Sequence, residues 1–450
     1  MYCLIVCILT LLLVFNATAF EVEANQQDLA AINTFDQSEI VDITAIRTTS
    51  FMLTDDGVLW GWGFYGCGMM GVGDYFAYDS PWGSLLFYTS ESALLMFEGI
   101  HGPRPLYRET SPIPIFNDVS SFVAVDTGRW FGRAFALRND GSLWGWGELR
   151  DGSSWHMFPE PVHIMDGVYY IADCGNWVIC LDGGLWNIDG TPVRVMDDVV
   201  AARGNHALRA DGSLWYATRS VFLKSHIMDD VVSFTSGCGA ILAIRTDGSL
   251  WGSGHNHRGR LGVSSAVARH EVPVHVMDDV AYVLSRCCST PSFAIRTDGS
   301  LWGWGWNGAR GELGVGSTAS YFDRPVHIMD NVSEVARGEN FTVALTMDGR
   351  LYSWGSNRSG ALGVGTYTDI TDLFCWTYGP RTIINANNDG LSPAFVLDRV
   401  TGFTVGLGHT LALRVDGSLW AWGFNSNGQV GDGSTVQRVS PVMIVASTVQ

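Results

Sequence analysis

Eight aspartates are the first residues of this chain whose type and spacing invite a chemical role. Each precedes a glycine, and a Leu and then a Trp or Tyr stand two and three positions after that glycine. The aspartates are Asp56, Asp140, Asp182, Asp211, Asp247, Asp298, Asp348 and Asp416. Carboxylates that converge can bind metal ions or transfer protons, but eight copies spread along a chain cannot all meet at one site. Asp-Gly is a strong hairpin signal, typical of the type I′ turn, so we predict eight turns.

Four histidines share one position of the repeated pattern. They are His163, His226, His275 and His327, and the corresponding residue of the third unit is Arg194. A metal site does not accept arginine in place of histidine, so we predict a surface position or one between units. His255 and His257 are close in sequence, but two ligands are too few for zinc without partners. We therefore assign no metal.

Two glycine-rich segments match the dinucleotide fingerprint, at Gly61-x-Gly63-x-x-Gly66 and Gly303-x-Gly305-x-x-Gly308. Neither opens a helix within a βαβ unit, which the pyrophosphate site requires. The sequence also lacks a Gly-x-Ser-x-Gly elbow for a nucleophilic serine. We assign no cofactor and no catalytic residue, and we predict that the protein is not an enzyme.

The elements that position these residues are short strands. An alternating apolar and polar stretch, such as residues 411–414, precedes each Asp-Gly pair and predicts a half-buried strand. The Leu-Trp-Gly-Trp-Gly that follows predicts the return strand, a Pro-Val-His-Ile-Met segment predicts a third, and residues 199–202 exemplify a fourth. Four strands make one propeller blade. We predict an all-β propeller over residues 41–446. Units three and four are short, so the ring has eight blades, or seven if those two units share one position.

The repeat resembles that of the regulator-of-chromosome-condensation (RCC1) family. The resemblance rests on residues 406–413, 416–423 and 425–433, with related versions at 305–316 and 355–365. It implies a β-propeller, usually with seven blades, whose loop-bearing face binds another protein. Members of the family include an exchange factor for a small GTPase, ubiquitin-ligase modules and a secreted inhibitor of β-lactamase. Fold and function are separate conclusions, because one fold hosts many functions.

The N-terminal segment indicates where the protein works, and the net charge limits the partners it can bind. Residues 4–15 form a nearly unbroken apolar run, and Ala17-Thr18-Ala19 follows as a small-x-small cleavage site. We predict a signal peptide over residues 1–19, a flexible lead-in over 20–40, and a secreted or cell-surface protein without membrane insertion after cleavage. An uncleaved anchor is the alternative. The formal net charge of −18 disfavours nucleic acid as a partner.

Two segments interrupt the repeat, residues 64–111 in unit one and residues 356–392 in unit seven. Loops carry function more often than scaffolds do, so we predict that these insertions bind a protein partner. The candidate contact residues are Trp82, Phe87, Tyr88, Trp376 and Tyr378. Alternatively, each insertion packs a small core of its own. Two other functions stay open: binding or modification of a glycan, and guanine-nucleotide exchange, which the signal peptide and the acidic charge disfavour.

Overall fold

The computed structural model describes residues 38–64, 70–72, 108–126, 132–151, 154–172, 175–217, 224–264, 267–285, 290–308, 310–366 and 389–447. The predicted signal peptide and most of both insertions lie outside these residues. So do all five predicted contact residues, Trp82, Phe87, Tyr88, Trp376 and Tyr378.

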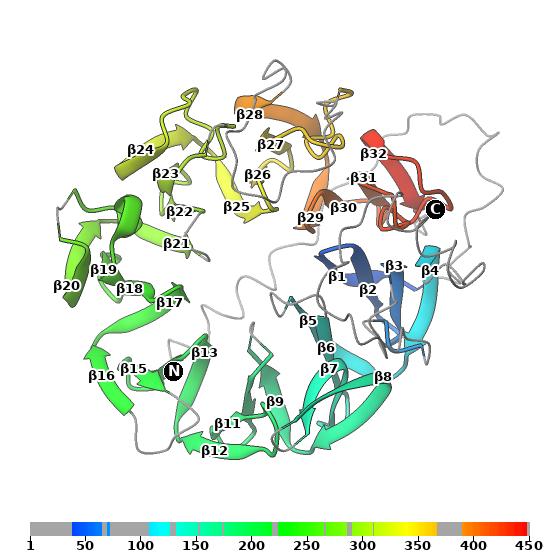
Figure 1. The fold of residues 1–450 in the computed structure, drawn as a ribbon, viewed down its shortest axis with the longest axis horizontal. Coiled ribbons are helices and arrows are strands. Elements are labelled where there is room, and N and C mark those ends of the chain that lie inside the picture. The colour runs from blue at the N-terminus through cyan, green and yellow to red at the C-terminus, as the bar shows by residue number, and fades with distance from the viewer. Residues whose placement is uncertain are drawn as a thin grey trace, which may run out of the picture.

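Eight four-stranded antiparallel sheets stand around a central axis (Figure 1). Each sheet is built from four consecutive strands, with the first strand nearest the axis and the fourth at the rim. The protein is therefore an all-β, eight-bladed propeller, and the two short units each form a blade of their own. Among the described residues the structure has one short 3-10 helix, η2 (His257–Gly259).

Blades 1 to 8 take their strands in chain order. Blades 1 and 2 contain β1 (Ile40–Ile46), β2 (Thr49–Thr54), β3 (Leu59–Phe64), β4 (Arg108–Phe116), β5 (Val119–Asp126), β6 (Gly132–Arg138), β7 (Leu143–Asp151) and β8 (Ser154–Met165). Blades 3 and 4 contain β9 (Val168–Ile171), β10 (Trp177–Cys180), β11 (Leu185–Asn187), β12 (Val193–Met196), β13 (Val199–Arg203), β14 (His206–Arg209), β15 (Leu214–Ala217) and β16 (Lys224–Met228). Blades 5 and 6 contain β17 (Val231–Gly237), β18 (Ala240–Arg245), β19 (Leu250–His255), β20 (Arg269–Met277), β21 (Val280–Leu284), β22 (Pro291–Arg296), β23 (Leu301–Trp306) and β24 (Tyr321–Met329). Blades 7 and 8 contain β25 (Val332–Arg337), β26 (Phe341–Thr346), β27 (Leu351–Gly355), β28 (Gly390–Leu397), β29 (Val400–Val405), β30 (His409–Arg414), β31 (Leu419–Gly423) and β32 (Arg438–Val445).

The strand bounds differ from the predicted segment bounds at three places. β1 begins at Ile40, within the predicted lead-in. β4 begins at Arg108 and β28 at Gly390, so the last residues of each predicted insertion are strand.

The Asp-Gly pairs form the hairpins between the second and third strands, as predicted, but the turn type was wrong. A type I′ turn needs positive φ at both central residues. Gly248 has a φ of +81°, whereas Asp247 is not among the described residues with positive φ. Gly248 donates its N–H to the carbonyl of Arg245, and Arg245 donates to the carbonyl of Ser249, each at 2.9 Å. This is a three-residue loop in which only the glycine takes the left-handed conformation.

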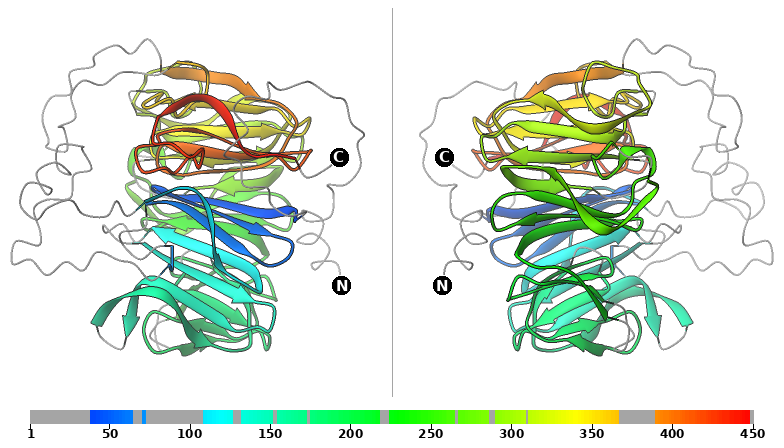
Figure 2. Two further views of the ribbon diagram at one scale, coloured as in Figure 1. Left: turned by 90° about the vertical axis from the view of Figure 1, so that its right-hand side faces the viewer. Right: turned by 90° about the vertical axis from the view of Figure 1, so that its left-hand side faces the viewer.

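Seen from the side, the blades form a disc with two faces (Figure 2). We call the end of each blade that carries the Asp-Gly hairpin the turn face. The opposite end, where the third strand connects to the fourth, is the loop face. On the turn face the hairpins of blades 1 to 7 also join the next blade; for example, Val231 of blade 5 donates its N–H to the carbonyl of Gly212 in blade 4 at 2.9 Å.

The hydrophobic core lies between adjacent blades. One cluster combines Leu242 and Leu250 of blade 5 with Val283 and Trp304 of blade 6, all of them buried. Equivalent clusters recur around the ring, and the one that contains Met52, Trp62 and Leu411 joins blade 8 to blade 1. Because every blade buries its two sheet faces against its neighbours, the ring has no exposed sheet face of its own.

Candidate functional site

The repeated aspartates hold tryptophans on the turn face. In blade 5, Ser249 donates its backbone N–H and its hydroxyl to Oδ1 of Asp247 at 2.9 and 2.5 Å, and Trp251 donates its indole N–H to the Ser249 hydroxyl at 2.8 Å. The equivalent Asp, Ser and Trp residues make the same bonds in blades 2, 4, 6 and 8. The hydrogen bond from Ser249 lowers the pKa of Asp247 below its usual value. The aspartates therefore act as turn residues that stay ionised.

The four repeated histidines pack on these tryptophans. His275 lies edge-on to Trp251, with 5.5 Å between ring centroids, and its Nε2 is 2.8 Å from Oδ1 of Asp278. His163, His226 and His327 make the matching contacts in their own blades. In blade 3, Arg194 contacts Asp197 and Asp182 instead. The predicted surface position is confirmed, and it explains why arginine substitutes for histidine: both donate to the same carboxylate.

The described residues hold neither a metal-ligand cluster nor a membrane-spanning helix. They contain no group of three or more His, Cys, Asp or Glu side chains placed to hold a metal ion. They contain no helix that is long and apolar enough to cross a membrane. His255, one of the close histidine pair, has its Nε2 3.2 Å from a guanidinium nitrogen of Arg269.

The innermost strands carry a second repeated feature. Each begins with an apolar residue, buried in blades 2 to 8, that is followed by two consecutive solvent-facing residues. We call these pairs the mouth ring: Val41-Asp42, Ser120-Ser121, Tyr169-Tyr170, Val200-Ala201, Val232-Ser233, Ala281-Tyr282, Ser333-Glu334 and Thr401-Gly402. A shift in strand register at this point, such as that between Val231 and Ser233, turns both residues the same way. Since these strands surround the axis (Figure 1), the mouth ring lines the centre of the disc next to the turn face.

The mouth ring is uneven in chemistry. Blades 3 to 6 supply most of the large apolar side chains, among which Tyr169 is 68% and Val200 is 55% exposed, and blade 1 adds Val41, which is 56% exposed. The charged members of the ring are Asp42 in blade 1 and Glu334 in blade 7. Protein surrounds both carboxylates although water reaches them, and this partial desolvation raises the pKa of Asp42 to about 6 and that of Glu334 to about 7.

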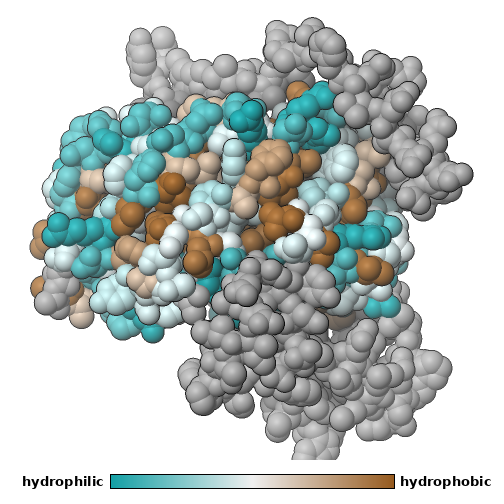
Figure 3. All heavy atoms as spheres, turned by 90° about the horizontal axis from the view of Figure 1, so that it is seen from above, coloured by the Kyte–Doolittle hydropathy of each residue, from teal (hydrophilic) through white to brown (hydrophobic). Residues whose placement is uncertain are grey.

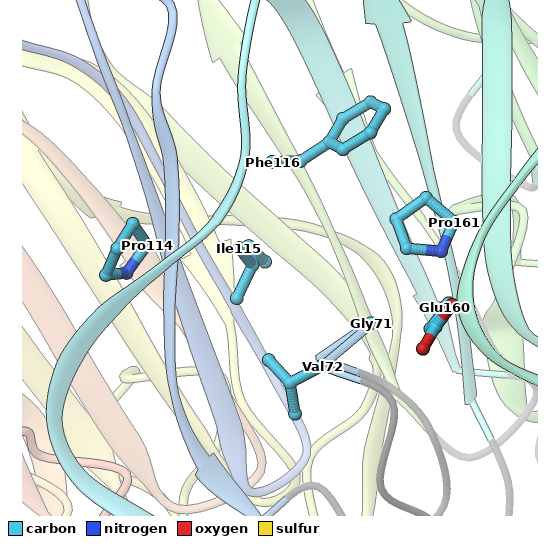
Figure 4. Close-up of a pocket in the computed structure, with 7 residues that line it drawn as sticks. All are labelled: Gly71, Val72, Pro114, Ile115, Phe116, Glu160 and Pro161. Atoms are coloured by element: carbon cyan, nitrogen blue, oxygen red, sulfur yellow. The ribbon is translucent and has the colours of Figure 1, made fainter.

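A hollow of about 470 Å³ lies between the outer strands of blades 1 and 2 (Figure 4). Pro114, Ile115 and Phe116 of β4 form one wall, and Glu160 and Pro161 of β8 form the other. A second hollow of about 360 Å³ continues along β4 to Arg138. The prolines cannot donate backbone hydrogen bonds, so they prevent strand addition at these rim edges. Glu160 is the one carboxylate among the described residues that line the larger hollow.

The rim elsewhere mixes apolar and polar residues. The edge of blades 6 and 7, seen from above in Figure 3, shows apolar residues between hydrophilic ones. Tyr321 on β24 and Phe395 on β28 are large apolar side chains of this rim, each more than half exposed.

The loop face presents a cluster at the junction of blades 2 and 3. β7 and β8 form the long hairpin of blade 2, and Trp155 at its end is 41% exposed. The guanidinium groups of Arg133 and Arg150 lie 5.8 and 6.0 Å from the Trp155 ring centroid. Both arginines also contact Asp189 of blade 3, at 3.8 and 3.4 Å.

Comparison with known proteins identifies the repeat. A model of the regulator of chromosome condensation (RCC1) repeat matches residues 298–345, 348–413 and 416–449, and a second model of that repeat matches 332–361 and 400–429. These are RCC1-like repeats. The matched residues run from the Asp-Gly hairpin of blade 6 through blade 8.

Curated relatives share part of this RCC1-like chain. The ultraviolet-B receptor UVR8 of Arabidopsis thaliana is 31% identical over 211 residues, which cover 45% of this chain and 43% of that protein. Protein RCC2 of Mus musculus is 27% identical over 246 residues, which cover 52% of this chain and 46% of that protein. The match thus spans less than half the length of either relative. Among solved structures, human WBSCR16 has a TM-score of 0.51 at 18% identity, covering 87% of this chain and 94% of that one. This likeness supports the fold alone.

Sequence reasoning did not find the mouth ring of this RCC1-like propeller. A strand was expected to alternate between buried and exposed residues, and the register shift in each innermost strand breaks that alternation. The recoverable signal is the repeated four-residue pattern of Val168 to Ile171, in which two exposed residues stand between two buried ones.

Proposed function

We propose that this RCC1-like propeller is a non-catalytic scaffold that binds a protein partner through its loop face. The observation that carries the proposal is the location of the two interruptions of the repeat. Both lie between a third and a fourth strand, after Phe64 in blade 1 and after Gly355 in blade 7. Both connections therefore leave the loop face, on either side of blade 8, and can contact one partner together.

The described part of the loop face adds a contact surface of a suitable kind. Trp155 is held between two arginines at the end of a rigid hairpin. Tryptophan and arginine are enriched among the residues that contribute most to protein interfaces. Asp189 fixes the guanidinium groups, so part of the entropy cost of ordering them is removed before a partner arrives.

Binding is favoured over catalysis by how the recurrent polar residues are used. The repeated aspartates are engaged by serine hydroxyls and backbone N–H groups, and the repeated histidines by aspartates. The curated relatives also differ in role by name: UVR8 is a receptor, and a further relative, the human E3 ubiquitin-protein ligase HERC2, is 28% identical over 205 residues, which cover 4% of that protein. What they share with this chain is the repeat, which suits a binding module.

The test is partner capture by the full chain and by two loop-face variants. One variant replaces residues 73–107 by a short Gly-Ser turn, which keeps the 70–72 segment on Trp146, and the other carries Trp155→Ala. We expect the first to lose at least nine-tenths of the captured partner, measured by cross-linking and mass spectrometry, and the second to lose severalfold. Phe395→Ala, on the rim near the turn face, is the matched control and should capture normally. Undiminished capture by the deletion variant, with an unchanged circular dichroism spectrum, would remove the proposal.

We further propose that the protein works outside the cell. The support is the apolar segment over residues 4–15 with its small-residue cleavage site. N-terminal sequencing of the protein from its native source is expected to start at Phe20. A chain that still begins at Met1 in the cytoplasm would rule out export.

A further inference from the structure

We propose that the mouth ring is a second binding site, on the turn face, for an extended peptide that alternates basic and apolar side chains. This site is separate from the loop-face site, and it would exist whether or not the loop-face proposal holds. It is assembled from the ring as a whole, because each blade contributes one pair of residues and no blade contributes a complete site.

The apolar part of the site is the sector formed by blades 3 to 6. Tyr169, Tyr170 and Tyr282 are 40–68% exposed, and Val200 and Val232 are each about half exposed. Exposed apolar side chains that form one continuous surface mark an interaction site, whereas scattered ones do not. Here the four innermost strands that carry them are consecutive around the axis (Figure 1), so these exposed side chains are gathered on one arc of the ring. Tyrosine adds a hydroxyl that bonds to a peptide backbone at little cost in entropy.

The polar part of the site is the opposite sector, formed by blades 7, 8 and 1. Glu334 and Asp42 flank Thr401 and Gly402 of blade 8. A Cβ placed on Gly402 would meet no atom within 4 Å, so this stretch of the wall is recessed between the two carboxylates. The ring carries no basic residue to neutralise them. A guanidinium or ammonium group is the complement of such a pair.

The turn face that surrounds the mouth ring is also negatively charged. The segments between blades place two aspartates side by side at Asp197-Asp198, Asp229-Asp230 and Asp278-Asp279. Arginines such as Arg209 and Arg296 offset part of this charge, but the aspartates outnumber them. A surface of one charge sign raises the local concentration of an oppositely charged ligand and its association rate. The ligand that fits both sectors is therefore a peptide with basic groups on one side and apolar groups on the other, as an extended chain with alternating residues presents.

The experiment measures fluorescence anisotropy of a labelled ten-residue peptide that alternates arginine and leucine, titrated with the full chain. We expect saturable binding that weakens at least tenfold in Asp42→Asn/Glu334→Gln, and at least tenfold in Tyr169→Ser/Tyr282→Ser. A peptide of glutamate and leucine should not bind, and one of arginine and serine should bind at least tenfold more weakly. The variant without residues 73–107 should bind the peptide normally, which separates this site from the loop-face site.

The matched control removes the same charge from the turn face outside the ring. Asp118→Asn/Asp279→Asn serves this purpose, because Asn331 occupies the same repeat position with the same positive φ. We expect less than a threefold loss of affinity. An equal loss in the control and in Asp42→Asn/Glu334→Gln would overturn the proposal, since binding would then follow net charge. Absence of saturable binding would overturn it as well. So would self-association of the wild-type chain, seen by sedimentation, that the Tyr169→Ser/Tyr282→Ser change abolishes, because the occupant would then be a second copy.

Discussion

The ring is divided into two arcs that join their blades differently on the loop face. At five junctions, those leading from blades 5, 6, 7, 8 and 1 to the next blade, a loop of one blade lies on a buried tryptophan of the next. The loop segments are 261–263, 313–315, 362–364, 430–432 and 70–72, and the tryptophans are Trp304, Trp354, Trp422, Trp62 and Trp146. At the other three junctions the loop is missing from the sequence, and the tryptophan position is Ile188, Ala217 or Ser253.

At these five junctions the loop of one blade and the buried tryptophan of the next form one structural unit, because neither occurs without the other. Trp354 donates its indole N–H to the carbonyl of Glu312 in the preceding blade at 3.0 Å, and Trp422 donates to Ala361 at 3.2 Å. Without the loop, the indole would lose both its acceptor and its packing. Without the tryptophan, the loop would cover nothing. The loop-free arc uses other bridges, for example Trp177 of blade 3, which donates to the carbonyl of Gly204 in blade 4 at 2.6 Å.

The largest effect should come from removing a tryptophan at the junction that closes the ring. Trp62→Ala deletes a fully buried side chain whose indole N–H bonds to the carbonyl of Gln429 at 2.9 Å. We expect the free energy of unfolding to fall by about 3–5 kcal/mol. Ser253→Ala is the matched change in the loop-free arc. Because Ser253 is a small side chain whose hydroxyl donates one hydrogen bond, to the carbonyl of His270 at 3.1 Å, its loss should cost about 1 kcal/mol or less. Urea unfolding of both variants checks this, and equal losses would contradict the distinction between the arcs.

A double-mutant cycle tests whether the loop of one blade rests directly on the tryptophan of the next. Gly363 has a φ of +71°, and a Cβ placed on it would lie 2.6 Å from Nε1 of Trp422. We expect Gly363→Ala to cost about 2–3 kcal/mol, as the sum of backbone strain and overlap with the ring. In a Trp422→Ala background the overlap is gone, and the cost should fall to about 1 kcal/mol. Additive effects in the cycle would show that the loop does not rest on the tryptophan.

The stability of the junction between blades 8 and 1 should depend on pH over a wider range than that of the loop-free arc. The hydroxyl of Ser50 donates to the carbonyl of Gln429 at 2.8 Å, so His409 must donate its Nε2–H to Ser50, at 2.9 Å. Burial lowers the pKa of His409 to about 3, and it lowers that of His206 in blade 4 to about 4. The unfolded chain takes up a proton on histidine near pH 6.5. Each histidine therefore supports the folded state fully above pH 6.5 and opposes it increasingly as the pH falls to its folded pKa.

The expected result is a change of slope in stability against pH. Between pH 6.5 and about 3, His409 should lower the free energy of unfolding by up to about 1.4 kcal/mol per pH unit, and His409→Gln should remove that slope. His206→Gln should do the same over the narrower range from pH 6.5 to about 4. Urea midpoints at several pH values measure both. A slope that His409→Gln leaves unchanged would show that His409 already carries its proton in the fold.

The features that could be predicted from the sequence are those that recur at the same position of each repeat. The hairpin at Asp247, though not its turn type, and the surface position of His275 were predictable, because both recur in register in blade after blade. The mouth ring was not, because the register shift that creates it leaves no mark on composition. The link between Gly363 and Trp422 was also missed, since the two residues belong to different repeats and meet only when the blades stack. Trp82 and Trp376 stay predictions, because they lie outside the described residues.

The smallest predicted effect concerns two short blades within the loop-free arc. Blade 4 holds Trp215 through Ser213 and His226, whereas blade 3 has Gly184 and Arg194 at these positions, and the buried indole nitrogen of Trp186 has no partner. Gly184→Ser alone should change little, because its Cβ would lie 2.9 Å from the Arg194 guanidinium. Gly184→Ser/Arg194→His makes room and supplies the acceptor, and we expect the free energy of unfolding to rise by about 0.5–1 kcal/mol. A double variant no more stable than the wild type would mean that Arg194, through its bonds to Asp182 and Asp197, already contributes to blade 3 as much as the serine and histidine contribute to blade 4.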